Sequence, residues 1–197
     1  EMTSTVDVFL GVPYAEPPTG RRRFKPPQKA RHWGTAPYNA RVLGPVCPQK
    51  VYYSQTTLPK QSEDCLYLNI YTPWMGRSSE LYPVMLFIHG GSYEEGSGNR
   101  YDGFTLAQHG VVVITINYRL GELGYLTTGD SVMPGNYGLL DQIEALKWVS
   151  ENIGSFRGDR SKVTVFGSSA GSASTGFLML SPYTKGMIFP LRNLHPA

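Results

Sequence analysis

Apolar residues follow two different patterns along this chain, and each pattern predicts a kind of β-strand. Residues 65–73, CLYLNIYTP, show an alternating pattern of apolar and more polar positions and are rich in residues that favour strands. Residues 83–91, PVMLFIHGG, and 111–118, VVVITINY, are short continuous apolar runs. Such runs are typical of strands that are buried on both faces of a sheet. A further strand is expected over residues 162–167, KVTVFG.

Helical periodicity is strongest over residues 136–153, NYGLLDQIEALKWVSENI. Steps of three and four residues place one apolar face on this helix, made of Leu139, Leu140, Ile143, Leu146, Val149 and Ile153. We expect a short helix over residues 102–110 with Asp102 as its N-cap. Another helix is expected to begin at Ala170 and to end before Pro182.

The order of these elements predicts the fold class. Strands that alternate with helices indicate an α/β fold with a largely parallel sheet. Residues 1–60 contain many prolines and turn residues, so we expect an irregular lead-in that contributes at most an antiparallel edge.

Composition narrows the class of protein. The 197 residues suffice for one domain with a sizeable core, and a net charge of +3 is too small to indicate a nucleic-acid partner. No motif indicates a metal or a cofactor, and we expect neither.

The two cysteines, Cys47 and Cys65, are equally compatible with a disulfide and with two buried thiols. A bridge between them would be worth roughly 3 kcal/mol and would indicate an oxidising compartment.

The candidate chemistry begins at Ser169, the centre of a G-x-S-x-G sequence between a predicted strand and a predicted helix. This setting predicts a nucleophile elbow, in which the N–H of Ala170 faces a developing oxyanion. A glycine-rich loop without chemistry is the alternative interpretation. After the strand that ends in HGGS, Gly91 and Ser92 are candidates for the remaining oxyanion donors, whereas we expect His89 to be a buried structural residue.

The partners that an elbow serine needs are missing from the residues after it. In folds with this elbow, an Asp or Glu and then a His follow the serine along the chain. The residues after Ser169 contain no Asp or Glu, and His195 is their one histidine. A serine hydroxyl without a base is a poor nucleophile, so we expect this chain to have at most residual esterase activity.

Three motifs in order resemble the type-B carboxylesterase and cholinesterase-like family. They are FLGVPYAEPPTGRRRF at residues 9–24, EDCLYLNIYTP at 63–73 and FRGDRSKVTVFGSSAG at 156–171. The resemblance implies part of an α/β-hydrolase fold with helices on both faces of the sheet, and a disulfide between Cys47 and Cys65. It also implies that residues 1–189 are the N-terminal part of a longer domain and that residues 190–197 are a divergent tail.

Within that family, several segments are most similar to the neuroligins, which are adhesion receptors. Ser92 and Ser168 are neuroligin-like, because hydrolases usually have Gly and Glu there, whereas the presence of Ser169 itself departs from the neuroligin pattern. This resemblance implies an extracellular or cell-surface protein with a neurexin-like partner, a membrane anchor and a dimeric state. The alternative is a hydrolase of small carboxylic esters. In either case, lining a gorge and packing in the core or at its rim are equally compatible with Trp74, Tyr93 and Tyr125.

Overall fold

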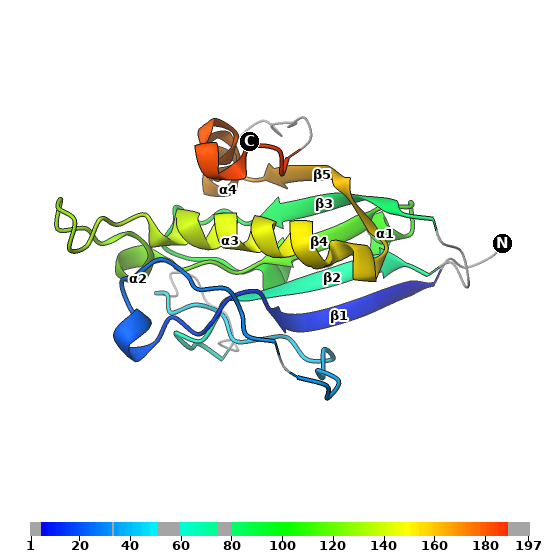
Figure 1. Cartoon of the computed structure of the whole chain (residues 1–197), viewed down its shortest axis with the longest axis horizontal. Helices are drawn as coiled ribbons and strands as arrows, with labels where there is room; N and C mark the ends of the chain where they lie inside the picture. Colours follow the sequence, from blue (N-terminus) through cyan, green and yellow to red (C-terminus); the bar gives the residue numbers. More distant parts are fainter. Residues whose placement is uncertain (1–4, 33, 51–59, 75–79, 189–197) are drawn as a thin grey trace.

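The computed structural model describes residues 5–32, 34–50, 60–74 and 80–188. A five-stranded sheet forms the centre of this described part, with the strand order β1-β2-β4-β3-β5 (Figure 1). The strands are β1 (Val6–Pro13), β2 (Tyr67–Pro73), β3 (Tyr82–Ile88), β4 (Val112–Ile116) and β5 (Gly158–Gly167). The four strands predicted from the sequence are therefore confirmed, and β1 supplies the expected antiparallel edge.

The C-terminal ends of β3, β4 and β5 lie at the same edge of the sheet. β3 lies parallel to β4 on one side and to β5 on the other, whereas β2 is antiparallel to both of its neighbours. Only β2 therefore runs against the other described strands, which confirms the prediction of a largely parallel sheet. Ile88 pairs with Ile116 and with Gly167, so the loops after β3, β4 and β5 leave the same edge of the sheet.

Helices cover both faces of the sheet, as the family resemblance implies. The α-helices are α1 (Phe104–Ala107), α2 (Gly121–Tyr125), α3 (Tyr137–Asn152) and α4 (Ala170–Leu180). Short 3-10 helices are η1 (Gly20–Arg22), η2 (Gly98–Arg100), η3 (Ile153–Phe156) and η4 (Pro182–Thr184). The N-cap of α1 is Gly103 rather than the predicted Asp102, whose carboxylate still accepts a 2.8 Å hydrogen bond from the N–H of Phe104, the first residue of the helix.

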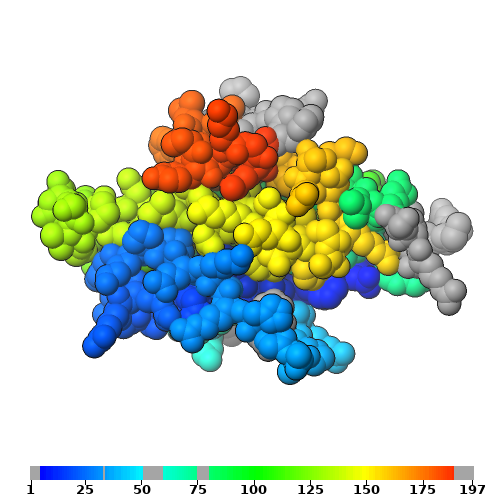
Figure 2. Space-filling model, in the orientation of Figure 1, coloured from blue at the N-terminus to red at the C-terminus, as the bar shows by residue number. Residues whose placement is uncertain are grey.

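The two faces of the sheet bury different amounts of apolar surface. In β4, Val112 and Ile114 belong to the main core, which also contains Leu146 of α3. The intervening Val113 points to the other face, where it packs with Ala107 of α1. On the main face, Figure 2 shows α3 lying between the N-terminal segment and α4.

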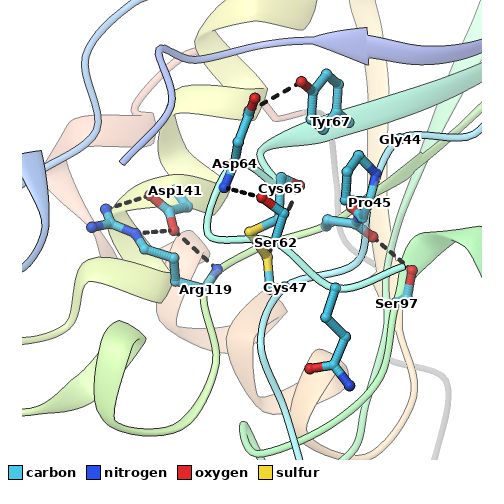
Figure 3. Close-up of a disulfide and its surroundings, with 12 residues drawn as sticks. Gly44, Pro45, Cys47, Ser62, Asp64, Cys65, Tyr67, Ser97, Arg119 and Asp141 are labelled. Carbon is cyan, nitrogen blue, oxygen red and sulfur yellow. Dashed lines mark hydrogen bonds and ion pairs between the residues drawn. A yellow bond between two sulfur atoms is a disulfide. The ribbon is translucent and has the colours of Figure 1, made fainter. Parts of the chain in front are cut away.

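The helix α3 also buries polar side chains that its periodicity did not predict. Asp141 and Gln142 are fully buried, whereas Leu139 and Leu140 of the predicted apolar face are only half-buried. Asp141 accepts hydrogen bonds of 2.8 and 2.7 Å from the Nε and Nη2 of Arg119, and a third from the Arg119 backbone N–H (Figure 3). Burial raises the pKa of Asp141, and its bonds to Arg119 oppose that rise. This ion pair fixes α3 to the chain that follows β4.

Candidate functional site

Ser169 lies in the sharp turn between β5 and α4, where the sequence predicts an elbow. Its φ of 54° and ψ of −124° form a strained conformation that is uncommon for a residue with a side chain. The flanking glycines are required by close backbone contacts. A Cβ on Gly171 would lie 2.0 Å from the carbonyl oxygen of Ile88, and a Cβ on Gly167 would lie 2.5 Å from the carbonyl carbon of Gly171.

The Ser169 side chain is exposed and has no base beside it in the described part of the chain. Its hydroxyl takes part in no hydrogen bond among the described residues, and their imidazoles are engaged elsewhere. The Nδ1 of His109 lies 2.8 Å from the carbonyl oxygen of Thr105, and the Nδ1 of His32 accepts a bond from Gly34. His195 lies outside the described residues. Among the residues that the structure describes, the Ser169 hydroxyl therefore has no proton acceptor.

A second tight turn, residues 89–96, follows β3 and contains the candidate oxyanion donors. Gly91, Ser92 and Tyr93 have φ values of 111°, 56° and 62°, so the backbone adopts three consecutive positive φ angles. A Cβ on Gly91 would lie 2.1 Å from the carbonyl oxygen of Glu95, so glycine is required there. Ser92 is exposed and adopts its positive φ despite having a side chain.

The two turns touch each other. A Cβ on Gly90 would lie 3.1 Å from the Cβ of Ser169 and 2.6 Å from the carbonyl oxygen of Ser168. In the described part of the chain, the N–H groups of Gly91, Ser92 and Ala170 donate no hydrogen bond. Free N–H groups next to an elbow serine are what an acceptor oxygen at this position requires.

His89 supports the second turn from within the core. Its ring is 1% exposed and stacks on Tyr118, with ring centres 4.3 Å apart. Its Nδ1 lies 2.8 Å from the carbonyl oxygen of Gly90, and because a carbonyl only accepts, Nδ1 carries the proton. The pKa of His89 is lowered to about 4, chiefly by burial and to a smaller extent by the charge of Arg100, against the opposing effect of the hydrogen bond to Gly90. A neutral, buried ring bonded to backbone agrees with the structural role that the sequence predicted.

Sequence reasoning missed two side chains that hold this turn. The Tyr118 hydroxyl donates a 2.7 Å hydrogen bond to the carbonyl oxygen of His89. At the other end of the turn, the side-chain amide of Gln49 exchanges two hydrogen bonds of 2.8 Å with the backbone of Gly96. Both residues lie far from the turn in sequence, and no motif connects them to it.

Gln49 follows closely on one half of the disulfide. Cys47 and Cys65 are bonded and almost completely buried, and the loop between them spans a sequence separation of 18 (Figure 3). The pairing that the family resemblance implied is therefore present. The bridge stabilises the segment from which Gln49 reaches the turn.

A cleft of about 770 Å³ opens beside Ser92. Tyr93 and Tyr125 line it, with ring centres 5.1 Å apart, so two of the three aromatic candidates for a gorge are brought together. Trp74 does not line this cleft. It is 53% exposed just after β2, and because β2 is antiparallel, that end lies at the edge of the sheet opposite Ser169.

Comparison with known proteins shows the family of this chain. The sequence model of the carboxylesterase family matches residues 1–189. The chain belongs to the carboxylesterase family. Among solved structures, a thermophilic PNB esterase superimposes with a TM-score of 0.87 at 46% sequence identity, over 94% of this chain and 40% of that one. This similarity confirms the α/β-hydrolase fold.

Proteins similar to this chain include neuroligins as well as an esterase. The chain is 45% identical to Neuroligin-2 of Mus musculus over 224 residues, which cover 95% of this chain and 27% of that protein. It is 43% identical to Neuroligin-3 of the same species over 227 residues, with the same coverage. The chain thus spans about a quarter of the length of these neuroligins.

The described residues contain neither a helix suited to cross a membrane nor a cluster of metal-binding side chains. No helix there is both long and apolar enough to cross a membrane. His, Cys, Asp and Glu side chains in the same ranges form no group of three that could hold a metal ion.

Proposed function

We propose that this chain is part of a neuroligin-like cell-adhesion ectodomain, which uses the carboxylesterase fold to bind a partner protein at the cell surface. The observation that carries the proposal is the presence of Ser92 and Ser168, two positions at which the chain resembles neuroligins rather than hydrolases. The 45% identity with Neuroligin-2 over 95% of this chain supports it.

The partner we propose is a neurexin-like cell-surface protein. The buried disulfide fits this location, because structural disulfides persist in the oxidising environment outside the cell. We further propose that the whole protein is anchored in the membrane and dimeric, as the resemblance to neuroligins implies.

Adhesion is tested by mixing two populations of cells. One population displays the whole protein and the other a neurexin-like ectodomain, and we expect the cells to form mixed aggregates. A PNB esterase displayed in the same way is the matched control, because it shares the fold, and it should give no aggregates. Equal aggregation with the control, or none with either protein, would refute the proposed partner.

A second function, hydrolysis of a small carboxylic ester, is favoured by the conformation of Ser169. A positive φ costs on the order of 1–3 kcal/mol at a residue with a side chain, and such strain concentrates at active sites. In this alternative, Ser169 is the nucleophile and Gly91, Ser92 and Ala170 are the oxyanion donors. The acid and the histidine of a triad would have to come from outside the described residues.

Covalent labelling separates the two functions. Under the adhesion proposal, a fluorophosphonate probe leaves the whole protein unlabelled, and aryl-ester hydrolysis stays at background. The Ser169→Ala variant is the control, because it keeps the fold but lacks the hydroxyl. Labelling or turnover that disappears in Ser169→Ala would establish the hydrolase instead.

A further inference from the structure

The Gln49 side chain is fully engaged by backbone groups of its near neighbour Cys47 and of the distant Gly96. Its Oε1 accepts from the N–H of Gly96 at 2.8 Å. Its Nε2 donates to the carbonyl oxygen of Gly96 at 2.8 Å and to that of Cys47 at 3.0 Å. One primary amide therefore satisfies one N–H and two carbonyl groups, an arrangement that uses the donors and the acceptor together.

The turn that Gln49 contacts needs support from outside. Three consecutive positive φ angles at residues 91–93 are strained, and such conformations persist only when their surroundings impose them. Residues 94 and 95 donate to the carbonyl oxygen of Gly91, so the turn is closed upon itself. Its first residue, His89, is fixed by Tyr118, and its last residue, Gly96, is fixed by Gln49.

Gln49 is itself held in place by its neighbours. Its backbone N–H donates to the Oε1 of Gln61 at 2.9 Å, and Cys47 is tied to Cys65 by the disulfide. The amide therefore projects from an anchored segment, and it lines the cleft beside Ser92.

We infer that Gln49 is a positioning residue whose amide fixes the C-terminal end of turn 89–96 and thereby the direction of the Gly91 and Ser92 N–H groups. The inference goes beyond the proposed function, because the turn has this shape whether the protein binds a partner or an ester. If the whole protein is a hydrolase, Gln49 orients the oxyanion donors without touching the substrate.

The test replaces the amide by a carboxyl group and follows backbone amide exchange in the full chain. Gln49→Glu keeps an acceptor for the Gly96 N–H but at neutral pH loses both donors and places a negative charge against two carbonyl oxygens. Protection of residues 94–96, whose N–H groups donate hydrogen bonds within the turn or to Gln49, should fall on the order of 10- to 100-fold at pH 7. Protection is corrected for intrinsic exchange rates and expressed relative to β4. Lowering the pH to 5 protonates the carboxyl, whose pKa the facing carbonyls raise, and should recover much of the loss relative to wild type.

Two further variants make the result specific. Gln28→Glu is the matched control, because Gln28 is exposed and its Oε1 accepts from Arg22 far from the turn, so protection of 94–96 should not change. Gln49→Met has similar length but no polar group, and its loss of protection should be the same at pH 7 and pH 5. Three results for Gln49→Glu would overturn the inference. They are wild-type protection at pH 7, a loss of protection that is as large at pH 5 as at pH 7, and an equal loss of protection throughout β4. Because exchange needs no substrate or partner, failure of the proposed function would leave these results unaffected.

Discussion

Two tight turns leave neighbouring parallel strands and meet at Ser169, but they are stabilised in different ways. The elbow, residues 167–171, keeps its shape because there is no space for a side chain at either glycine. The turn over residues 89–96 also lacks space for a side chain at Gly91, but it depends in addition on Gln49 and Tyr118, which approach it from distant parts of the sequence. The first turn is specified by close backbone packing, and the second by close packing together with hydrogen bonds from distant side chains.

This difference determines how each turn should respond to mutation. A change at the elbow puts atoms into occupied space, and a packed backbone relaxes poorly around such a clash. Removing a hydrogen bond from the other turn costs much less, because one or two partners remain to hold it. A side chain at an elbow glycine should therefore cost far more stability than the loss of one hydrogen bond to the second turn, which should loosen only in part.

The largest effect is expected for Gly171→Ala. The new Cβ would lie 2.0 Å from the carbonyl oxygen of Ile88, and that oxygen belongs to the central strand β3 and has little freedom to move. We expect the free energy of unfolding, measured by chemical denaturation, to fall by at least about 3 kcal/mol.

Gly176→Ala is the matched control for that substitution. Gly176 lies in the same helix, and a Cβ there meets nothing within 4 Å. Because alanine favours helix over glycine, this variant should be more stable than wild type by about 0.5–1 kcal/mol. A similar loss of stability in both variants would show that α4, rather than the contact with Ile88, is sensitive to substitution.

An intermediate effect is expected from protonation of His89, which lies at the start of the second turn. Burial lowers the pKa of His89 to about 4, whereas an unfolded histidine titrates near 6.5. The unfolded state therefore binds more protons between these values, and the contribution to stability is lost as the pH falls from about 6.5 to 4. The total loss is about 3 kcal/mol.

Comparison with His89→Asn separates the contribution of His89 to the free energy of unfolding from that of titrating carboxylates. The asparagine amide can replace Nδ1 as donor to the carbonyl oxygen of Gly90, but it does not titrate. Denaturation at a series of pH values should show a steeper decline for wild type than for the variant below about pH 6.5. Parallel curves would mean that His89 binds no extra proton on unfolding.

The same contrast explains which parts of the molecule the sequence predicts. Strands, helices and the elbow follow from short-range patterns, and the residues around Ser169 suffice to locate it. Gln49 and Tyr118 carry no local signal, because their partners are backbone atoms of a segment far away in sequence. The burial of Asp141 on α3 could not be predicted from local sequence either, because a charged residue is stable there only through its ion pair with Arg119.

Trp74 shows a second limit of sequence reasoning. An aromatic residue at a strand end is a reasonable candidate for a binding gorge, and Tyr93 and Tyr125 do line the cleft. The position of Trp74 depends on the direction of β2, and the alternating pattern of a strand does not encode its direction. Topology therefore decides which aromatic residues share a site.

The smallest effect is expected for Tyr118→Phe, which removes one hydrogen bond from the second turn and keeps the ring. Burial raises the pKa of Tyr118, so its hydroxyl remains a donor to the carbonyl oxygen of His89 at every pH of interest. Loss of this bond leaves the carbonyl without that donor, and we expect a cost of between about 1 and 2 kcal/mol in chemical denaturation. Stacking on the His89 ring should persist, so amide exchange should increase more in residues 89–96 than in the elbow. Equal loosening of both turns would contradict the idea that only the second depends on distant side chains.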